Sequence, residues 1–275
     1  MFPRVIGSAV LVALALSTLT GCGRQVSKES SRDLLATGPD REAPPVPRPW
    51  TVSVLDATGG LANWMKCTKI EVGATVSAYR QDGSFYLTEH KFDIYPWSDV
   101  IQVSAREPGA NLTWQVDSDR YRPPESDPNR QISPLSAWYR EYAEAVLQIT
   151  TAPVRMLDRN VSTAPRPGTV QITGQWYRPL EAKYRAEKAD SRAKGRGKSV
   201  VEPYWTQGIY FQDQNGAIVD MVWLGSPAMQ KYLIVRGYDY ARTVDGVLLP
   251  TRIELFQSDP DANFGPRLAL VDLKQ

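Results

Sequence analysis

The chain has 275 residues, of which 42% are apolar and 23% charged, and its 32 basic and 30 acidic residues leave a formal net charge of +2. This composition excludes a disordered chain, and so small a net charge gives no reason to expect a nucleic-acid partner. One histidine and two cysteines exclude most metal sites that need several imidazoles or thiolates, and they allow at most one disulfide.

Residues 1–21 have the pattern of a secretory signal peptide. Arg4 precedes an apolar run at 5–16, which is too short for a membrane-spanning helix. The stretch Leu19-Thr20-Gly21-Cys22 is similar to a bacterial lipobox, in which small residues precede a cysteine that is acylated and becomes the new N-terminus. An ordinary secretory signal that contains a cysteine is the alternative. We predict lipid attachment, such as palmitate, at Cys22.

The lipobox also predicts where in the cell the protein is located. Acylated Cys22 would anchor the protein to a membrane of the bacterial envelope without a spanning helix. Gly23 follows the cysteine, where proteobacterial lipoproteins retained in the inner membrane commonly have Asp. We therefore predict a lipid-anchored protein that faces the periplasm from the outer membrane.

Residues 22–49 are predicted to be a flexible tether. They contain few large apolar side chains, and Ser and charged residues give way to Pro44, Pro45, Pro47 and Pro49. The folded domain is predicted to cover residues 50–275.

Alternation of apolar and polar residues dominates this domain and predicts a curved antiparallel sheet of about nine to eleven strands. Ile70, Val72, Ala74 and Val76 share one face of a first strand at 68–78. Hairpin turns are predicted at Asp82-Gly83, Asn215-Gly216 and Asp245-Gly246. Further strands are predicted at 100–105, 111–117, 169–177, 230–238 and 267–273.

Two helical segments are predicted. The first, at 53–65, is interrupted by Gly59-Gly60. The second, at 133–150, has Ser133 as its N-cap and Pro134 as its first residue, and Leu135, Trp138, Tyr142, Val146 and Ile149 form an apolar stripe. This helix is expected to lie across the sheet, so the fold class is mostly β, with few helices.

Two stretches resemble the LolA/LolB-like group of lipoprotein carriers and receptors. GGLANWMKCTKIEV (59–72) is similar to the entry to the first strand, and VDGVLLPTRIELF (244–256) is similar to a late hairpin. The resemblance implies a half-barrel with an apolar concave face and a helical lid, which accommodates acyl chains in that group. The carrier has no lipid anchor, and neither protein has the insertion near residue 190.

The aromatic and methionine residues are the candidates for a hydrophobic ligand groove, because rings and a thioether adapt to variable chains. The alternative is that they only pack the helix onto the sheet. The candidates are Trp114, Trp138, Tyr142, Trp176, Met221 and Trp223.

Other conspicuous residues have ordinary explanations. His90 has no second imidazole or thiolate pair to join it, so a structural role is favoured over catalysis or metal binding. Cys67 is interpreted as a small buried residue. The basic run at 185–199 is interpreted as a solvated loop, with binding to anionic lipid or a cell-wall polymer as the alternative.

No nucleotide-binding or hydrolase motif occurs, so we predict a protein that is not an enzyme and has no cofactor. The predicted function is non-catalytic binding or transfer of a lipid, a lipoprotein acyl chain or another hydrophobic ligand. The alternative is an envelope interaction module that has a side-chain-filled cavity and binds a protein or glycan partner.

Overall fold

The computed structural model describes residues 50–274 except 108–109, 118–119, 126–132, 186, 189–199, 202 and 214–217. The signal peptide, Cys22, the tether at 22–49 and the Asn215-Gly216 turn lie outside these residues. The division of the chain at residues 21 and 49 therefore stays a prediction.

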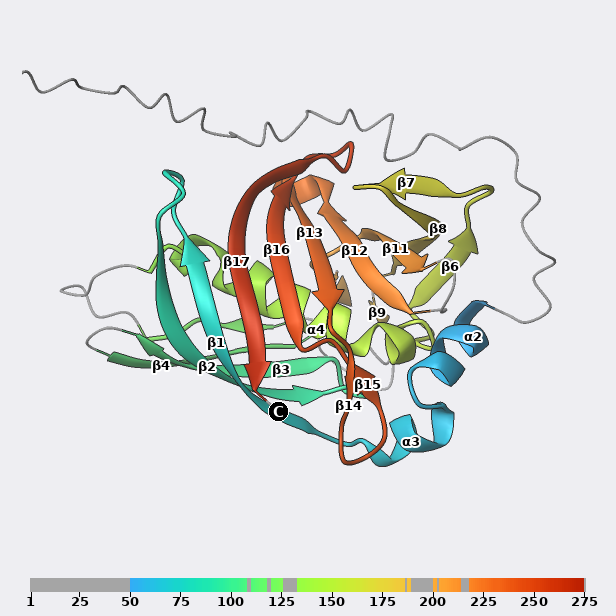
Figure 1. Cartoon of the computed structure of the whole chain (residues 1–275), viewed down its shortest axis with the longest axis horizontal. Helices are drawn as coiled ribbons and strands as arrows, with labels where there is room; N and C mark the ends of the chain where they lie inside the picture. The colour runs from blue at the N-terminus through green and yellow to red at the C-terminus, as the bar shows by residue number, and fades with distance from the viewer. Residues whose placement is uncertain are drawn as a thin grey trace, which may run out of the picture.

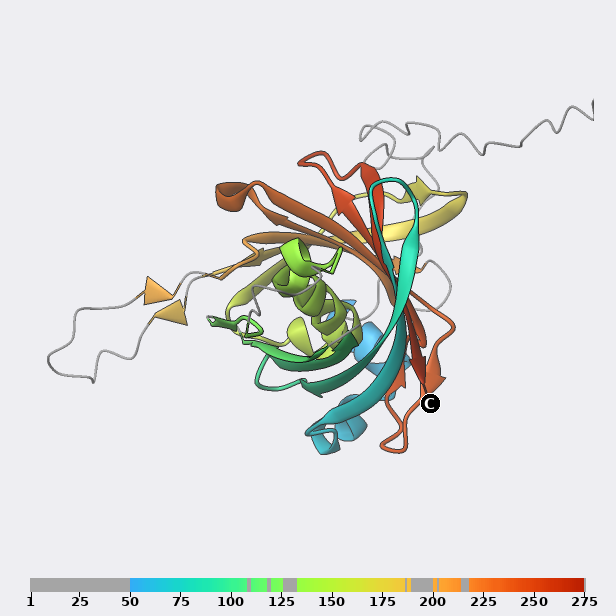
Figure 2. The same cartoon turned by 90° about the vertical axis from the view of Figure 1, so that its left-hand side faces the viewer.

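One curved antiparallel sheet of 13 strands forms the body of the molecule (Figures 1 and 2). This confirms the predicted fold class. Along the sheet the strands follow the order β5-β4-β3-β2-β1-β17-β16-β13-β12-β11-β8-β6, and β7 pairs with β8. The first half contains β1 (Ile70–Tyr79), β2 (Phe85–Tyr95), β3 (Val100–Glu107), β4 (Ala110–Val116) and β5 (Tyr121–Arg122).

The second half of the sheet joins the first through its last strand, which pairs with β1 in the middle of the sheet. Its strands are β6 (Val161–Pro165), β7 (Val170–Ile172), β8 (Gln175–Tyr184), β11 (Gln207–Asp213), β12 (Val219–Ser226), β13 (Lys231–Tyr238), β16 (Arg252–Ser258) and β17 (Phe264–Lys274). Two small ribbons stand apart from the sheet: β9 (Glu187–Lys188) with β10 (Val200–Val201), and β14 (Ala241–Arg242) with β15 (Leu248–Leu249).

The sheet has more strands than predicted because some strands are too short to be recognised from the alternation of apolar and polar residues. The predicted strand at 169–177 is in fact a hairpin of β7 and β8. Thr173 and Gly174 both have positive φ, 50° and 85°, and this backbone gives the two-residue turn whose twist matches that of the strands. A Thr-Gly pair within an alternating run reads as continuous strand, so β7 was missed as a separate element.

The hairpin predicted at Asp82-Gly83 is present between β1 and β2. Gly83 has φ of 82°, and the Asp82 carboxylate accepts a hydrogen bond from the Ser84 amide at 2.8 Å. The first strand begins at Ile70 rather than at residue 68. The Asp245-Gly246 turn also occurs, where it closes the ribbon of β14 and β15.

The first predicted helix is divided, as the two glycines indicated, into α2 (Trp50–Ala57) and α3 (Leu61–Lys66). Gly59 has φ of 120°, and a Cβ atom on it would lie 2.5 Å from the Gly246 carbonyl oxygen. The neighbouring Gly60 also has positive φ, 82°, but no atom lies within 4 Å of its Cβ position. Both glycines are therefore conformationally required, but only Gly59 is also required by contact.

We expect Gly59→Ala to lower the free energy of unfolding by about 2 kcal/mol, because backbone strain and a backbone clash add together. Gly60→Ala is the matched control and should cost about 1 kcal/mol, because it meets the strain alone. Urea unfolding of both variants measures the difference. Equal losses would mean that the contact between Gly59 and Gly246 does not constrain the fold.

The predicted helix at 133–150 is displaced along the chain. A 3₁₀ turn, η1 (Ser136–Trp138), precedes α4 (Tyr139–Arg155), so Ser133 and Pro134 are not its cap and first residue. The Ser133 hydroxyl accepts instead from the Leu135 amide at 3.2 Å and is hydrogen-bonded to Tyr86. The helix also continues beyond residue 150, through Pro153, because it is surrounded by packed structure and needs little intrinsic propensity.

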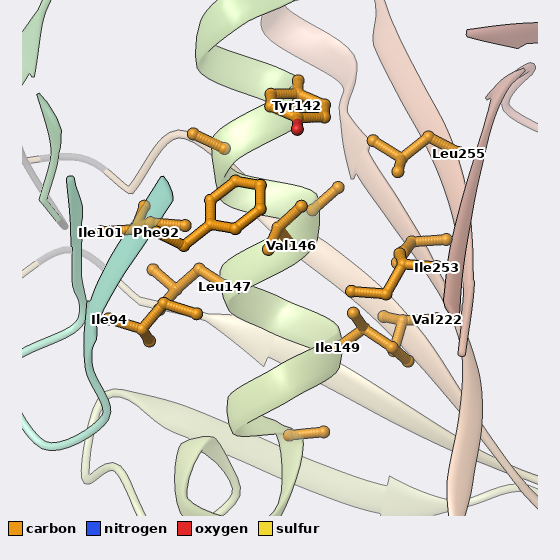
Figure 3. Close-up of a cluster of buried hydrophobic side chains, with 14 of the residues drawn as sticks. Phe92, Ile94, Ile101, Tyr142, Val146, Leu147, Ile149, Val222, Ile253 and Leu255 are labelled. Carbon is orange, nitrogen blue, oxygen red and sulfur yellow. The ribbon is translucent and has the colours of Figure 1, made fainter. Parts of the chain in front are cut away.

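Helix α4 lies against the concave face of the sheet, as Figure 2 shows. Every residue of α4 except Arg140 is buried. Figure 3 shows Leu147 facing Ile94 and Ile101 of the first half of the sheet, while Ile149 faces Val222 of the second half. The interior between helix and sheet is thus filled by apolar side chains from both halves.

Candidate functional site

The six residues proposed for a ligand groove do not meet in one place. Trp114 and Tyr142 are buried in the cluster between α4 and the sheet, and Trp138 packs against that cluster. Met221 and Trp223 belong to a second buried cluster, because side chains on β12 alternate and their neighbours Val222 and Leu224 face α4. Trp176, on β8, is half-buried and belongs to neither cluster.

Trp114 and Tyr142 fix α4 to the first half of the sheet. The Trp114 indole donates to the Tyr139 carbonyl oxygen at 3.1 Å, and the rings of these two residues lie 4.6 Å apart. The Tyr142 hydroxyl is hydrogen-bonded to Nδ1 of His90 at 2.9 Å. Both tryptophan and tyrosine therefore combine apolar burial with a polar contact.

His90 and Cys67 have the structural roles expected of them. His90 is 3% exposed, and burial lowers the pKa of its imidazole to about 3, so the ring is neutral at physiological pH. Cys67 is 1% exposed, and burial raises the pKa of its thiol to about 11, which keeps it a thiol. No group of three His, Cys, Asp or Glu side chains suited to a metal ion occurs among the described residues.

A second side of α4 is polar, yet all of its residues except Arg140 are also buried. Arg140, Glu144, Gln148 and Arg155 recur at spacings that place them along one stripe of the helix. Arg140 Nε lies 3.8 Å from Glu144 Oε1. The Gln148 side-chain oxygen accepts from the Tyr210 hydroxyl at 3.0 Å.

The end of this stripe is held by an ion pair with the turn between β2 and β3. Arg155 Nη1 lies 2.6 Å from Asp99 Oδ2 and 3.6 Å from Asp158 Oδ2. Asp99 has φ of 54°, a left-handed backbone that Asp tolerates better than most residues. A strained residue whose side chain is ion-paired in the interior is typical of a functional site.

A cavity of about 350 Å³ opens beside this polar stripe. Its walls are the polar side of α4, the β2–β3 turn, the segment that follows α4, the end of β8, and residues 203–205, which precede β11. We call it the α4 cavity. Tyr204 holds residues 203–205 in place, since its hydroxyl donates to Glu141 at 2.5 Å and Arg140 lies 4.0 Å from its ring centre.

Burial changes the protonation of two carboxyl groups in the α4 cavity. Desolvation, with a smaller contribution from the nearby charge of Asp99, raises the pKa of Glu144 to about 8. Desolvation also raises the pKa of Asp99 to about 6, although Arg155 opposes the shift. Near neutral pH, Glu144 is therefore mostly protonated and able to donate a hydrogen bond.

The α4 cavity has no clear signal in the sequence. The apolar stripe of the helix predicts its packing on the sheet, whereas four-residue spacing of Arg140, Glu144 and Gln148 is the ordinary pattern of a solvated helix face. Asp99 and residues 203–205 carry no motif. The polar stripe could have been noticed, but its burial depends on segments far apart in the chain.

The basic run at 185–199 is described only in part. Arg185 lines the α4 cavity, and Glu187–Lys188 pairs with Val200–Val201. Residues 186 and 189–199 lie outside the described part of the chain. Among the described residues, no helix is long and apolar enough to cross a bilayer.

No protein-family model matches the chain, and no curated protein matches it in sequence. Solved structures resemble it in fold. A LolA superfamily protein from Nitrosomonas europaea is 12% identical, with a TM-score of 0.46, over 81% of this chain and 90% of the other. A DUF1329 family protein from Desulfovibrio piger is 11% identical, with a TM-score of 0.40, over 82% and 90%.

A structure described as an outer membrane lipoprotein-sorting protein domain, from Vibrio parahaemolyticus, is 9% identical, with a TM-score of 0.36, over 82% of this chain and 92% of the other. The curved open sheet with a helix on its concave face is the architecture that the resemblance in sequence implied. The likeness concerns the fold alone, and it assigns no ligand to this chain.

Proposed function

We propose that this protein is a lipid-anchored protein of the bacterial envelope that binds an apolar ligand without catalysis, on the concave face of its half-barrel. The ligand would be a lipid or the acyl part of another lipoprotein. The observation that supports this proposal is the apolar surface beneath α4. Strands from both halves of the sheet contribute to it, and one helix covers it (Figure 3).

The ligand and α4 would compete for this surface. Val146, Leu147 and Ile149 now occupy the space between helix and strands. An acyl chain that replaced these contacts would bury a similar apolar area, at about 25 cal/mol per Å². Binding would therefore require α4 to move away from the strands.

Brominated fatty acid tests this proposal, because bromine quenches a tryptophan that it contacts. We expect saturable quenching of a version of the chain that begins at Trp50, together with lipid that co-purifies from bacteria and is detected by mass spectrometry. Trp114→Phe should reduce the quenched fraction, since Trp114 is buried between α4 and the sheet.

The matched control is Trp223→Phe, because Trp223 is buried in the second cluster, across the sheet from α4. The intensity lost on quenching should stay as in the unmodified protein, because the removed residue is not among those quenched. Absence of both quenching and co-purified lipid would reject the apolar-ligand proposal. Quenching that depends on Trp223 but not on Trp114 would move the ligand to the other face.

The second candidate function is an interaction module that binds a protein or glycan partner with a filled interior. The burial of α4 on nearly all sides favours it. This function predicts that the protein remains free of lipid in the same experiment.

The lipid anchor has its own test. We expect Cys22→Ser to abolish labelling by a palmitate analogue and to release the protein from membranes, because the thiol that accepts the acyl chain is lost. Membrane fractionation and labelling measure both effects. Continued labelling would show that the acyl chain is attached elsewhere.

A further inference from the structure

The α4 cavity is a second candidate site, and the binding of an apolar ligand makes no use of it. Its volume of about 350 Å³ lies within the range of small-ligand pockets. Its walls combine polar and apolar side chains and come from segments far apart in the sequence. A ligand of this cavity would therefore differ in chemistry from the apolar ligand proposed above.

Three buried polar atoms of its lining residues have no hydrogen-bond partner among the described residues. They are the acceptor Oδ1 of Asp99 and the donors Nε of Arg155 and Nε1 of Trp205. Trp205 is only 3% exposed. An unpaired buried polar group costs free energy, so such groups usually find a partner in water or a ligand.

An aromatic ring also forms part of the cavity wall. Trp97 also lines the α4 cavity, and 46% of its surface is exposed, which is unusual for so large an apolar side chain. Its indole Nε1 donates to the Trp64 carbonyl oxygen at 2.9 Å, so the ring is held in place. A fixed, partly exposed ring can pack against the apolar face of a ligand.

The α4 cavity is lined by charged side chains of both signs. Asp99 and Asp158 face Arg155, and Arg159 and Arg185 also line the cavity. An anion would meet the two carboxylates, a cation would meet the arginines, and an acyl chain would leave the polar atoms unpaired. A hydroxyl group both donates and accepts, so it suits this mixture of acceptors and donors.

We propose that the α4 cavity binds a neutral carbohydrate unit, whose hydroxyl groups bond to Asp99, Arg155 and Trp205 and whose ring packs against Trp97. Near neutral pH the protonated carboxyl group of Glu144 adds a further donor. This site is independent of the apolar face between α4 and the sheet, because it lies on the polar side of the helix.

Fluorine NMR of the full-length acylated protein, labelled with 5-fluorotryptophan and kept in a detergent without sugar groups, tests the proposal. The chain has eight tryptophans, and single Trp→Phe variants assign their signals. The probes are cellobiose, N,N′-diacetylchitobiose and inorganic phosphate. We expect at least one sugar to shift the Trp97 and Trp205 signals saturably in the millimolar range, while Trp176 and Trp223 stay unchanged.

Trp205→Phe keeps a ring but removes the Nε1 donor, so it should weaken sugar binding about threefold to tenfold. Trp176→Phe is the matched control and should leave the affinity unchanged. The shifts in the unmodified protein test the site even if Trp205→Phe fails to fold. Saturation by phosphate alone, no saturable shift with either sugar, or an unchanged affinity of a folded Trp205→Phe variant would overturn the proposal.

Discussion

Glu144→Gln is expected to make the protein more stable near pH 9 by about 5 kcal/mol and to change its stability near pH 5 by less than about 1 kcal/mol. The carboxyl group of Glu144 has its pKa raised to about 8 in the folded protein, from 4.5 when it is solvated. Gln is neutral at every pH and nearly equal in shape. The variant therefore mimics the protonated acid.

The sign follows from proton binding. Between these two pKa values the folded protein holds a proton that the unfolded chain has released. The stabilisation from the neutral acid is complete below about pH 4.5 and is lost as the pH rises through 8. Urea unfolding of both proteins at several pH values measures the two curves, which should separate as the pH rises.

Glu141 provides the control, one turn earlier on α4. Its carboxylate lies 3.3 Å from Lys231 Nζ and accepts from the Tyr204 hydroxyl. Glu141→Gln removes an ion pair, so we expect lower stability at both pH values. Parallel curves for Glu144→Gln and the unmodified protein would show that Glu144 is ionised in the folded state.

Arg155→Met is expected to lower the free energy of unfolding by about 4 kcal/mol near pH 8, because it leaves a buried carboxylate without its partner. Arg155 is 9% exposed and lies 2.6 Å from Asp99. Met retains most of the aliphatic length, so the loss reports the charge. Urea unfolding measures it.

The loss should be smaller near pH 5. The carboxyl group of Asp99 has its pKa raised to about 6, so it takes up a proton below that pH and no longer needs a cation. The double variant Asp99→Asn with Arg155→Met should regain part of the stability lost near pH 8, since it removes the unpaired charge. A double variant no more stable than Arg155→Met alone would contradict this account of the ion pair.

The strands were predictable because their signals are local. Alternation along β1 and the Asp82-Gly83 turn are contained within a few residues, and the structure has both the strand and the turn. The boundaries of α4 were not predictable in this way. Ser133 and Pro134 have the residue types of a helix start, but the Ser133 hydroxyl is used by Leu135 and Tyr86, which is 47 residues away along the chain.

The candidate site was predictable only in part. The apolar stripe predicted that α4 packs on the sheet, and Trp114 and Tyr142 do meet there. Met221 and Trp223 were grouped with them by residue type, whereas alternation on β12 places them across the sheet from α4. The face that a strand turns toward a helix cannot be known until its neighbours are known.

The sequence by itself determined an antiparallel, mostly β domain with one strongly amphipathic helix, because side-chain periodicity and turn residues act over short distances. Only the tertiary structure decided that β1 pairs with β17 and that α4 is buried on its polar side as well. The α4 cavity exists because the polar side of α4 is covered by other segments. Segments distant in the chain together desolvate this site, which raises the pKa of Asp99 and Glu144. The same burial leaves polar atoms of Asp99, Arg155 and Trp205 without a partner among the described residues.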